Sequence, residues 1–272
     1  MKKLLAITAL SAALFFGQTA AAEEKAAEEV KPSHVEMVLV LDESGSMSNL
    51  TNDTIGGFNS MIEKEKKLDV DAHVTTVLFN DQYKMLYNRR ELKDVRKMTD
   101  KDYTPGGMTA LLDAVGRTIH KMDMVSGIHR KDKGNKVLFV IITDGEENDS
   151  KEYTYADVKK LIKDRQENAG WEFIFLGANI DAAAAAENLG IDRDRAVKYK
   201  NTGSGVRANF KAVAELSDSL AKSGRVSDEW KSQVEEDTDE NVMVAPADTK
   251  EHTAPPAKPV KKHLVSKVRK AK

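Results

Sequence analysis

The chain has 272 residues, of which 40% are hydrophobic, 32% are charged and none is cysteine, and its formal net charge is -2. This composition is typical of one soluble domain with additional segments, and the lack of cysteine excludes disulfides, thiolate metal sites and cysteine nucleophiles. A bound metal would need oxygen or imidazole ligands. The near-zero charge gives no reason to expect specific nucleic-acid binding.

The amino-terminal segment has the pattern of a cleavable signal peptide. Two lysines precede an apolar run at 4–16, and small residues end the segment at Ala22. The run is too short to span a bilayer, which takes about 20 residues. We therefore expect a signal peptide at 1–22, a polar linker at 23–34, and a secreted or periplasmic protein with no transmembrane segment after cleavage.

The region 35–222 alternates short apolar runs with helical patterns, which is typical of a mainly parallel sheet covered by helices. Strand-like runs lie at 35–41, 73–79, 83–87, 137–142, 172–176 and 195–199. Helical spacing is present around Phe58, Val115, Val158, Ala184 and Phe210. The connection between residues 79 and 83 is too short for a crossover, so we expect an antiparallel hairpin and one reversed edge strand.

Capping residues predict where several helices begin. Asn52 or Asp53 is available as N-cap of the first helix, and Asp181 as N-cap of an alanine-rich helix. Thr154 with Asp157 resembles a capping box.

The segment 223–272 has an acidic block followed by a basic one, and four of the six prolines lie between Pro246 and Pro259. Such a segment buries too little apolar surface to offset chain entropy, so we expect a disordered tail with a short helix near Trp230. Its basic end would contact an anionic surface or fold back on the acidic block, and the charge pattern leaves both open.

A group of polar residues is expected at one rim of the sheet. The run at 35–41 ends in a carboxylate, Asp42, followed by hydroxyls at alternate positions. Loops at the carboxyl ends of parallel strands form the ligand crevice of α/β sheets. Two further loops, one opening a helix and one following a strand, should reach the same rim. The residues expected to meet there are Asp42, Ser44, Ser46, Thr109 and Asp144.

Two carboxylates and three hydroxyls are suitable ligands for a hard divalent cation such as Mg²⁺. The carboxylates balance the charge of the ion, and the neutral hydroxyls leave it electrophilic. Such an ion would accept an exposed Asp or Glu of a partner protein as a further ligand. Glu43, Glu146 and Glu147 are also expected along the rim, where they would repel an acidic partner.

The pattern resembles the von Willebrand factor type A (vWA) domain, whose metal-ion-dependent adhesion site (MIDAS) is Asp-x-Ser-x-Ser with a distant Thr and Asp. Asp42, Ser44, Ser46, Thr109 and Asp144 match all five positions, and the segments GGMTALLDA and IITDGEEN look like those of bacterial stand-alone members. The resemblance spans 35–222. It implies a doubly wound, Rossmann-like α/β fold with one antiparallel edge strand. It also implies bound Mg²⁺ or Mn²⁺, and metal-bridged protein binding, in adhesion or complex assembly, rather than catalysis.

Two other functions remain open. A strand ending in Asp also begins the active site of phosphatases that resemble haloacid dehalogenases, in which Asp42 would be phosphorylated. Those sites have an acid two residues later, where this chain has Ser44. In the second alternative, the domain is a structural scaffold in which the metal ion only orders three loops. The histidines show no ligand spacing and are interpreted as structural or surface residues.

Overall fold

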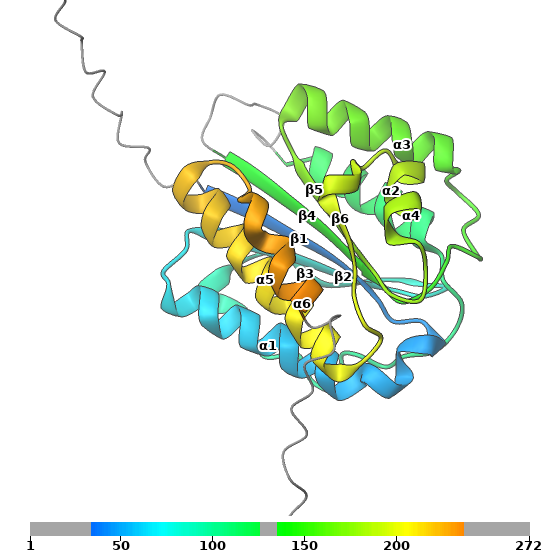
Figure 1. The fold of residues 1–272 in the computed structure, drawn as a ribbon, viewed down its shortest axis with the longest axis horizontal. Coiled ribbons are helices and arrows are strands. Elements are labelled where there is room, and N and C mark those ends of the chain that lie inside the picture. Colours follow the sequence, from blue (N-terminus) through cyan, green and yellow to red (C-terminus); the bar gives the residue numbers. More distant parts are fainter. Residues whose placement is uncertain (1–33, 126–134, 237–272) are drawn as a thin grey trace, which may run out of the picture. The chain divides into compact units, whose positions relative to one another are not determined.

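The computed structural model describes residues 34–125 and 135–236. The predicted signal peptide, the linker up to residue 33 and the tail beyond Glu236 lie outside these ranges. Figure 1 shows a central sheet with helices on both faces. Within the described ranges, no helix has the length and apolar character needed to span a bilayer.

The described residues form a sheet with the strand order β3-β2-β1-β4-β5-β6. The strands are β1 (His34–Asp42), β2 (Ala72–Phe79), β3 (Tyr83–Glu91), β4 (Asn135–Thr143), β5 (Glu172–Gly177) and β6 (Ala196–Lys198). β1 pairs in parallel with β2 and β4, whereas β3 pairs antiparallel with β2, as the short connection predicts. The chain moves outward in opposite directions from β1 and β4, so the carboxyl ends of these strands flank the switch point where α/β sheets bind ligands.

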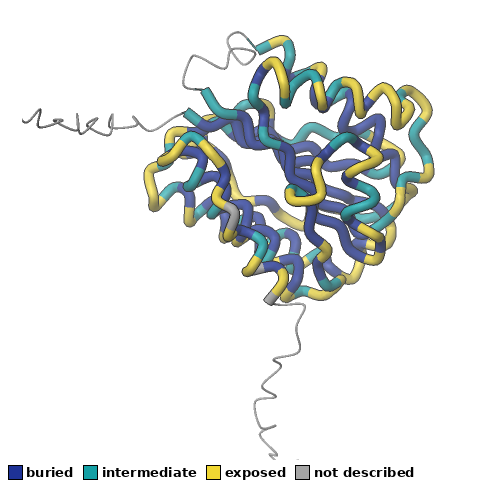
Figure 2. Tube along the Cα trace, turned by 45° about the horizontal axis from the view of Figure 1, so that its top comes forward, coloured by how far each residue is buried: buried dark blue, intermediate teal, exposed yellow. Residues whose placement is uncertain are grey.

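The helices cover the two faces of the sheet in separate groups (Figure 1). α1 (Thr51–Lys67) and α5 (Gly203–Ser223) pack in a cluster that contains Leu39 of β1. α2 (Leu111–Asp123), α3 (Tyr155–Asp164) and α4 (Ala182–Leu189) pack in a second cluster that contains the next residue, Val40. β1 is therefore buried on both faces. Figure 2 shows buried segments, in dark blue, at the centre of the described chain. The doubly wound fold with one antiparallel edge strand is confirmed.

The predicted N-caps are confirmed at two helices and wrong at a third. Thr154 and Asp157 form the predicted capping box at α3, and the Asp181 carboxylate accepts a hydrogen bond of 3.0 Å from the backbone of α4. The N-cap predicted at Asn52 or Asp53 is wrong. A 3₁₀ helix (Gly45–Leu50) leads directly into α1, so both residues lie inside the first turn.

Residues 224–236, assigned above to the tail, pack on the domain. Val226, Trp230 and Val234 are buried in the same cluster as α5. The last of them belongs to α6 (Ser232–Glu236), which confirms a short helix near Trp230. The packed region extends past residue 222 because these three apolar side chains, spaced four residues apart, provide buried surface in an otherwise polar segment.

α1 and α5 form a close contact on their face of the sheet. A Cβ on Gly57 would lie 2.5 Å from the Phe210 ring, so the helices approach where α1 has no side chain. Farther along, the fully buried Glu65 carboxylate accepts a hydrogen bond of 2.9 Å from Ser217, and its second oxygen has no partner among the described residues. Burial raises the pKa of Glu65 to about 7.

Candidate metal centre

β1 and β4 place the two predicted aspartates side by side. β1 ends at Asp42, Asp144 directly follows β4, and parallel pairing aligns the two strands up to their ends. The Thr143 hydroxyl donates a hydrogen bond of 2.6 Å to the Asp42 carboxylate, which links the strand ends. Both aspartates are buried, with exposed fractions of 1% and 2%.

The loop after β1 connects these aspartates through serine hydroxyls. The Ser44 backbone N–H donates a hydrogen bond of 2.7 Å to Asp42, and the Ser44 and Ser46 hydroxyl oxygens lie 3.1 Å apart. The Ser46 hydroxyl in turn donates a hydrogen bond of 2.5 Å to Asp144. Four of the five predicted residues therefore form one connected polar group.

Thr109 reaches the same rim from the loop before α2. Its Oγ1 atom lies 3.7 Å from the point where a Cβ would stand on Gly145, and Ser46 Oγ lies 3.9 Å from that point. Thr109 is 4% exposed, whereas Ser46 lies at the surface. The structure thus brings all five predicted residues together.

Backbone contacts tie the three loops to one another. The Asn148 side chain accepts a hydrogen bond of 2.9 Å from the Thr109 N–H, and the backbone N–H of Asn148 donates one of 3.0 Å to the Thr109 carbonyl. The Gly45 N–H donates to the Gly107 carbonyl at 3.2 Å. The backbone around Thr109 is therefore held by both other loops.

Three supporting residues were not singled out as site residues from the sequence. Besides Thr143, the Tyr103 hydroxyl donates a hydrogen bond of 2.6 Å to the Asp42 carbonyl, and Asn201 donates one of 3.3 Å to the Asp144 carboxylate. Burial raises the pKa of Tyr103 well above its usual range. Thr143 adjoins Asp144 and could have been found there, but no motif marks Tyr103 or Asn201.

The acidic neighbours differ from expectation. Glu43 is 4% exposed, and Lys84 Nζ lies 3.0 Å from its carboxylate, so its charge is buried and paired. Glu147 accepts a hydrogen bond of 2.9 Å from the Leu112 N–H at the start of α2. Glu146 is exposed. Repulsion of an acidic partner is thus weaker than three rim carboxylates would produce.

The electrostatics of the five residues suit a cation. Burial raises the pKa of the Asp42 carboxyl, hydrogen bonds from Ser44 and Thr143 oppose that shift, and the charge of Asp144 adds to it. In the part of the chain that the structure describes, no lysine, arginine or histidine pairs with either aspartate. Buried carboxylates without a cationic partner are costly, and a divalent ion would neutralise them within a set of oxygen donors.

Comparison with known proteins identifies the family. A family model described as the vWA found in the TerF C terminus matches residues 34–196. The chain belongs to this vWA family. The matched part of the vWA domain runs from the start of β1 to the start of β6 and includes all five site residues. A comparison with curated proteins finds no match.

Solved structures share the vWA fold at low sequence identity. The pilus adhesin SpaC from Lactobacillus rhamnosus GG, in its open conformation, is 14% identical with a TM-score of 0.55, and the match covers 71% of this chain and 31% of that one. The vWF domain of the type V pili tip protein Mfa5 from Porphyromonas gingivalis is 12% identical with a TM-score of 0.50, covering 72% of this chain and 99% of that one. The PilB minor pilin from Streptococcus sanguinis is 11% identical with a TM-score of 0.50, covering 68% and 61%. This chain therefore spans under a third of SpaC, and the likeness concerns the fold.

Proposed function

We propose that this protein is an extracytoplasmic, metal-dependent protein-binding module and not an enzyme. Asp42, Ser44, Ser46, Thr109 and Asp144 form a complete MIDAS that holds Mg²⁺ or Mn²⁺. The bound ion supplies an electrophilic centre for the carboxylate of an exposed Asp or Glu on a partner protein. The predicted signal peptide supports the extracytoplasmic location, and SpaC and Mfa5, a pilus adhesin and a pilus tip protein by description, support a role in adhesion or complex assembly.

The observation that carries the proposal is the pair of buried carboxylates joined by serine hydroxyls. Asp42 and Asp144 are each at most 2% exposed. Ser44 and Ser46 connect them by hydrogen bonds, and Ser46 lies at the surface. The aspartates supply the balancing charge, and the hydroxyls of Ser44, Ser46 and Thr109 supply neutral oxygen donors. The exposed side of the site is left for the partner.

Metal binding is tested first, with two matched serine variants. Ser46→Ala removes a proposed ligand, whereas Ser48→Ala removes an exposed hydroxyl that bonds to the Gly45 carbonyl in the same 3₁₀ helix. Mn²⁺ bound to the purified chain is counted by electron paramagnetic resonance. We expect at least about tenfold weaker binding for Ser46→Ala and parental binding for Ser48→Ala. Equal affinities would reject the metal site.

Partner binding is tested with Thr109→Ala, which leaves both aspartates in place. Envelope extract is passed over the immobilised chain with Mg²⁺ or with EDTA, and each captured protein is retested after its exposed acidic residues are replaced by amides. The proposal predicts capture that needs Mg²⁺, Thr109 and one acidic residue of the partner. Capture that survives loss of all three would reject the metal bridge.

The same samples separate the two alternatives. A scaffold would lose stability in EDTA without losing a partner. A phosphatase of the haloacid dehalogenase type would form a beryllofluoride adduct on Asp42, detectable by ¹⁹F nuclear magnetic resonance. An adduct would replace the binding proposal with an enzymatic one.

A further inference from the structure

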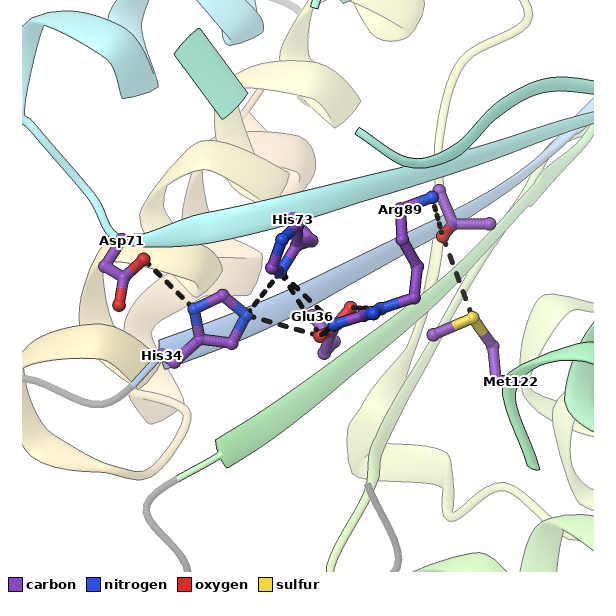
Figure 3. Close-up of polar contacts among 7 residues, drawn as sticks. His34, Glu36, Asp71, His73, Arg89 and Met122 are labelled. Atoms are coloured by element: carbon purple, nitrogen blue, oxygen red, sulfur yellow. Dashed lines mark hydrogen bonds and ion pairs between the residues drawn. The ribbon is translucent and has the colours of Figure 1, made fainter. Parts of the chain in front are cut away.

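A second group of ligand-type side chains lies at the opposite end of β1. His34 and Asp42 are the first and last residues of this strand, about 26 Å apart at ~3.3 Å per residue. Pairing of β1 with β2 places Glu36 opposite His73, and His34 lies beside them (Figure 3). Among the described residues, His34, Glu36 and His73 form the cluster whose donor atoms all lie within 4.8 Å of one another.

The three donor atoms have the spacing of a metal coordination face. His34 Nε2 lies 2.8 Å from His73 Nδ1 and 3.3 Å from Glu36 Oε1, and the last two atoms are 3.4 Å apart. A circle through these atoms has a radius of about 1.8 Å, so an ion about 2.0 Å from each would lie just outside their plane. This spacing fits three ligands of a tetrahedral Zn²⁺ site that has a fourth, non-protein ligand.

The surroundings provide support and access. Asp71 Oδ1 lies 3.0 Å from His34 Nδ1, the ring nitrogen that faces away from the cluster. A carboxylate in this position orients a metal-binding imidazole and raises its basicity. The Glu36 side chain is 2% exposed, but those of His34 and His73 are 18% and 27% exposed. Both histidines and Asp71 line a surface cavity of about 470 Å³, which gives an ion a path to the two histidines.

Arg89 supplies the positive charge at this cluster (Figure 3). Its guanidinium forms a close ion pair with Glu36 Oε1, and one of its nitrogens lies 3.3 Å from His73 Nδ1. Its Nε also donates to Glu36 Oε2 at 3.0 Å. The backbone of Arg89 has φ of 43°, a left-handed conformation unusual for a residue with a Cβ, where the pairing of β3 with β2 is irregular. The guanidinium therefore supplies, beside Oε1, the positive charge that a bound ion would supply.

We propose that His34 Nε2, His73 Nδ1 and Glu36 Oε1 bind a divalent transition-metal ion of the Zn²⁺ class, in competition with the Arg89 guanidinium. Two imidazoles and one carboxylate select Zn²⁺, Co²⁺, Ni²⁺ or Cu²⁺ over Mg²⁺, which prefers oxygen. Glu36 Oε2 remains available to Arg89 when Oε1 holds the ion. The cluster thus differs in ligand chemistry from the oxygen site at the other end of β1.

The test is a Co²⁺ titration of the purified full chain in excess Mg²⁺, followed by visible absorption. The visible absorption of Co²⁺ depends on its coordination number, and the excess Mg²⁺ occupies sites with oxygen ligands only. His129, His252 and His263, which lie outside the described residues, are replaced with glutamine in every sample. His120→Gln is the matched control, because this side chain is 54% exposed and lies on α2.

We expect one Co²⁺ per chain with the absorption of a four- or five-coordinate ion. His34→Gln and His73→Gln should each bind at least about tenfold more weakly, and His120→Gln should match the parent. Arg89→Met should bind about tenfold more tightly, because it removes a positive charge beside the ion. Unchanged affinity in both histidine variants, or no gain in Arg89→Met, would overturn the proposal.

Discussion

The Ser46 hydroxyl donates a hydrogen bond of 2.5 Å to the Asp144 carboxylate, although 98 residues separate the two in the chain. This bond closes the site across the switch point of the sheet, between a loop that follows β1 and one that follows β4. It satisfies one carboxylate oxygen without a cation. The fold is therefore expected to persist without metal, and the ion to add stability to an assembled site.

Asp144→Asn should uncouple the stability of the domain from Mg²⁺. The substitution removes one of two buried like charges, so the metal-free variant should melt at or above the temperature of the parent. The parent should gain about 2.7 kcal/mol when Mg²⁺ exceeds its Kd a hundredfold, and the variant should gain far less. Calorimetry with EDTA measures the melting temperature without metal, and calorimetry with Mg²⁺ measures the gain in stability. The exposed Glu146→Gln variant should keep the parental response, and an equal Mg²⁺ gain in Asp144→Asn would contradict the prediction.

Two adjacent glycines of α1 should respond in opposite directions to alanine. Gly57→Ala would place a Cβ 2.5 Å from the Phe210 ring and should lower the free energy of unfolding by about 1–3 kcal/mol. A Cβ on Gly56 would have nothing within 4 Å, so Gly56→Ala should raise the free energy of unfolding by about 0.5–1 kcal/mol. Urea unfolding measures both. Similar effects at the two positions would show that α1 and α5 are not in close contact.

Glu65 should make the domain less stable as the pH rises from 4.5 to 7. Its pKa is raised from 4.5 to about 7 by burial, so the folded protein holds the proton more tightly than the unfolded chain. The resulting stability is complete below pH 4.5 and is lost as the pH passes through 7. Glu65→Gln should remove this slope and be more stable above pH 7, by at most about 3 kcal/mol.

Urea unfolding between pH 5 and 8 checks this prediction, with Glu63→Gln as control. Glu63 lies on the same helix, its side chain is 47% exposed, and Lys66 lies 3.9 Å away. The control should keep the parental slope. An unchanged slope in Glu65→Gln would assign the pH dependence to other groups.

Asp113 should anchor the loop that follows the candidate metal centre. Its carboxylate accepts hydrogen bonds of 2.9 Å from the backbone N–H groups of Lys151, Glu152 and Tyr153. Burial alone would raise the pKa of Asp113, but these three donors lower it. Asp113→Ala should cost about 2 kcal/mol or more and speed hydrogen exchange at the three amides.

The control for Asp113 is Asp149→Ala in the same loop. The Asp149 carboxylate lies 3.4 Å from Lys151, whose side chain is 77% exposed, and such pairs contribute little. Parental exchange at the amides in Asp113→Ala would show that the loop is held by other contacts.

The sequence predicts most of the fold because buried parallel strands read as continuous apolar runs. Asp42 and Asp144 could be placed for the same reason, since Asp42 directly follows such a run and Asp144 is separated from one only by Thr143. Tyr103 and Asn201 could not, because they come from irregular segments whose path depends on the whole fold. The cluster at His34 and His73 depends on strand register, which the spacing of residues within one strand does not reveal.

β1 contributes to both candidate ion sites, and this limits how its length can change. Glu36 and Asp42 are an even number of residues apart, and alternation places them on the same side of the sheet as Val38 and Val40. Deleting one residue between them would turn the side chains of one group to the opposite face of the sheet, whichever half of the strand kept its register. Only insertions or deletions in pairs would leave a protein able to form both sites.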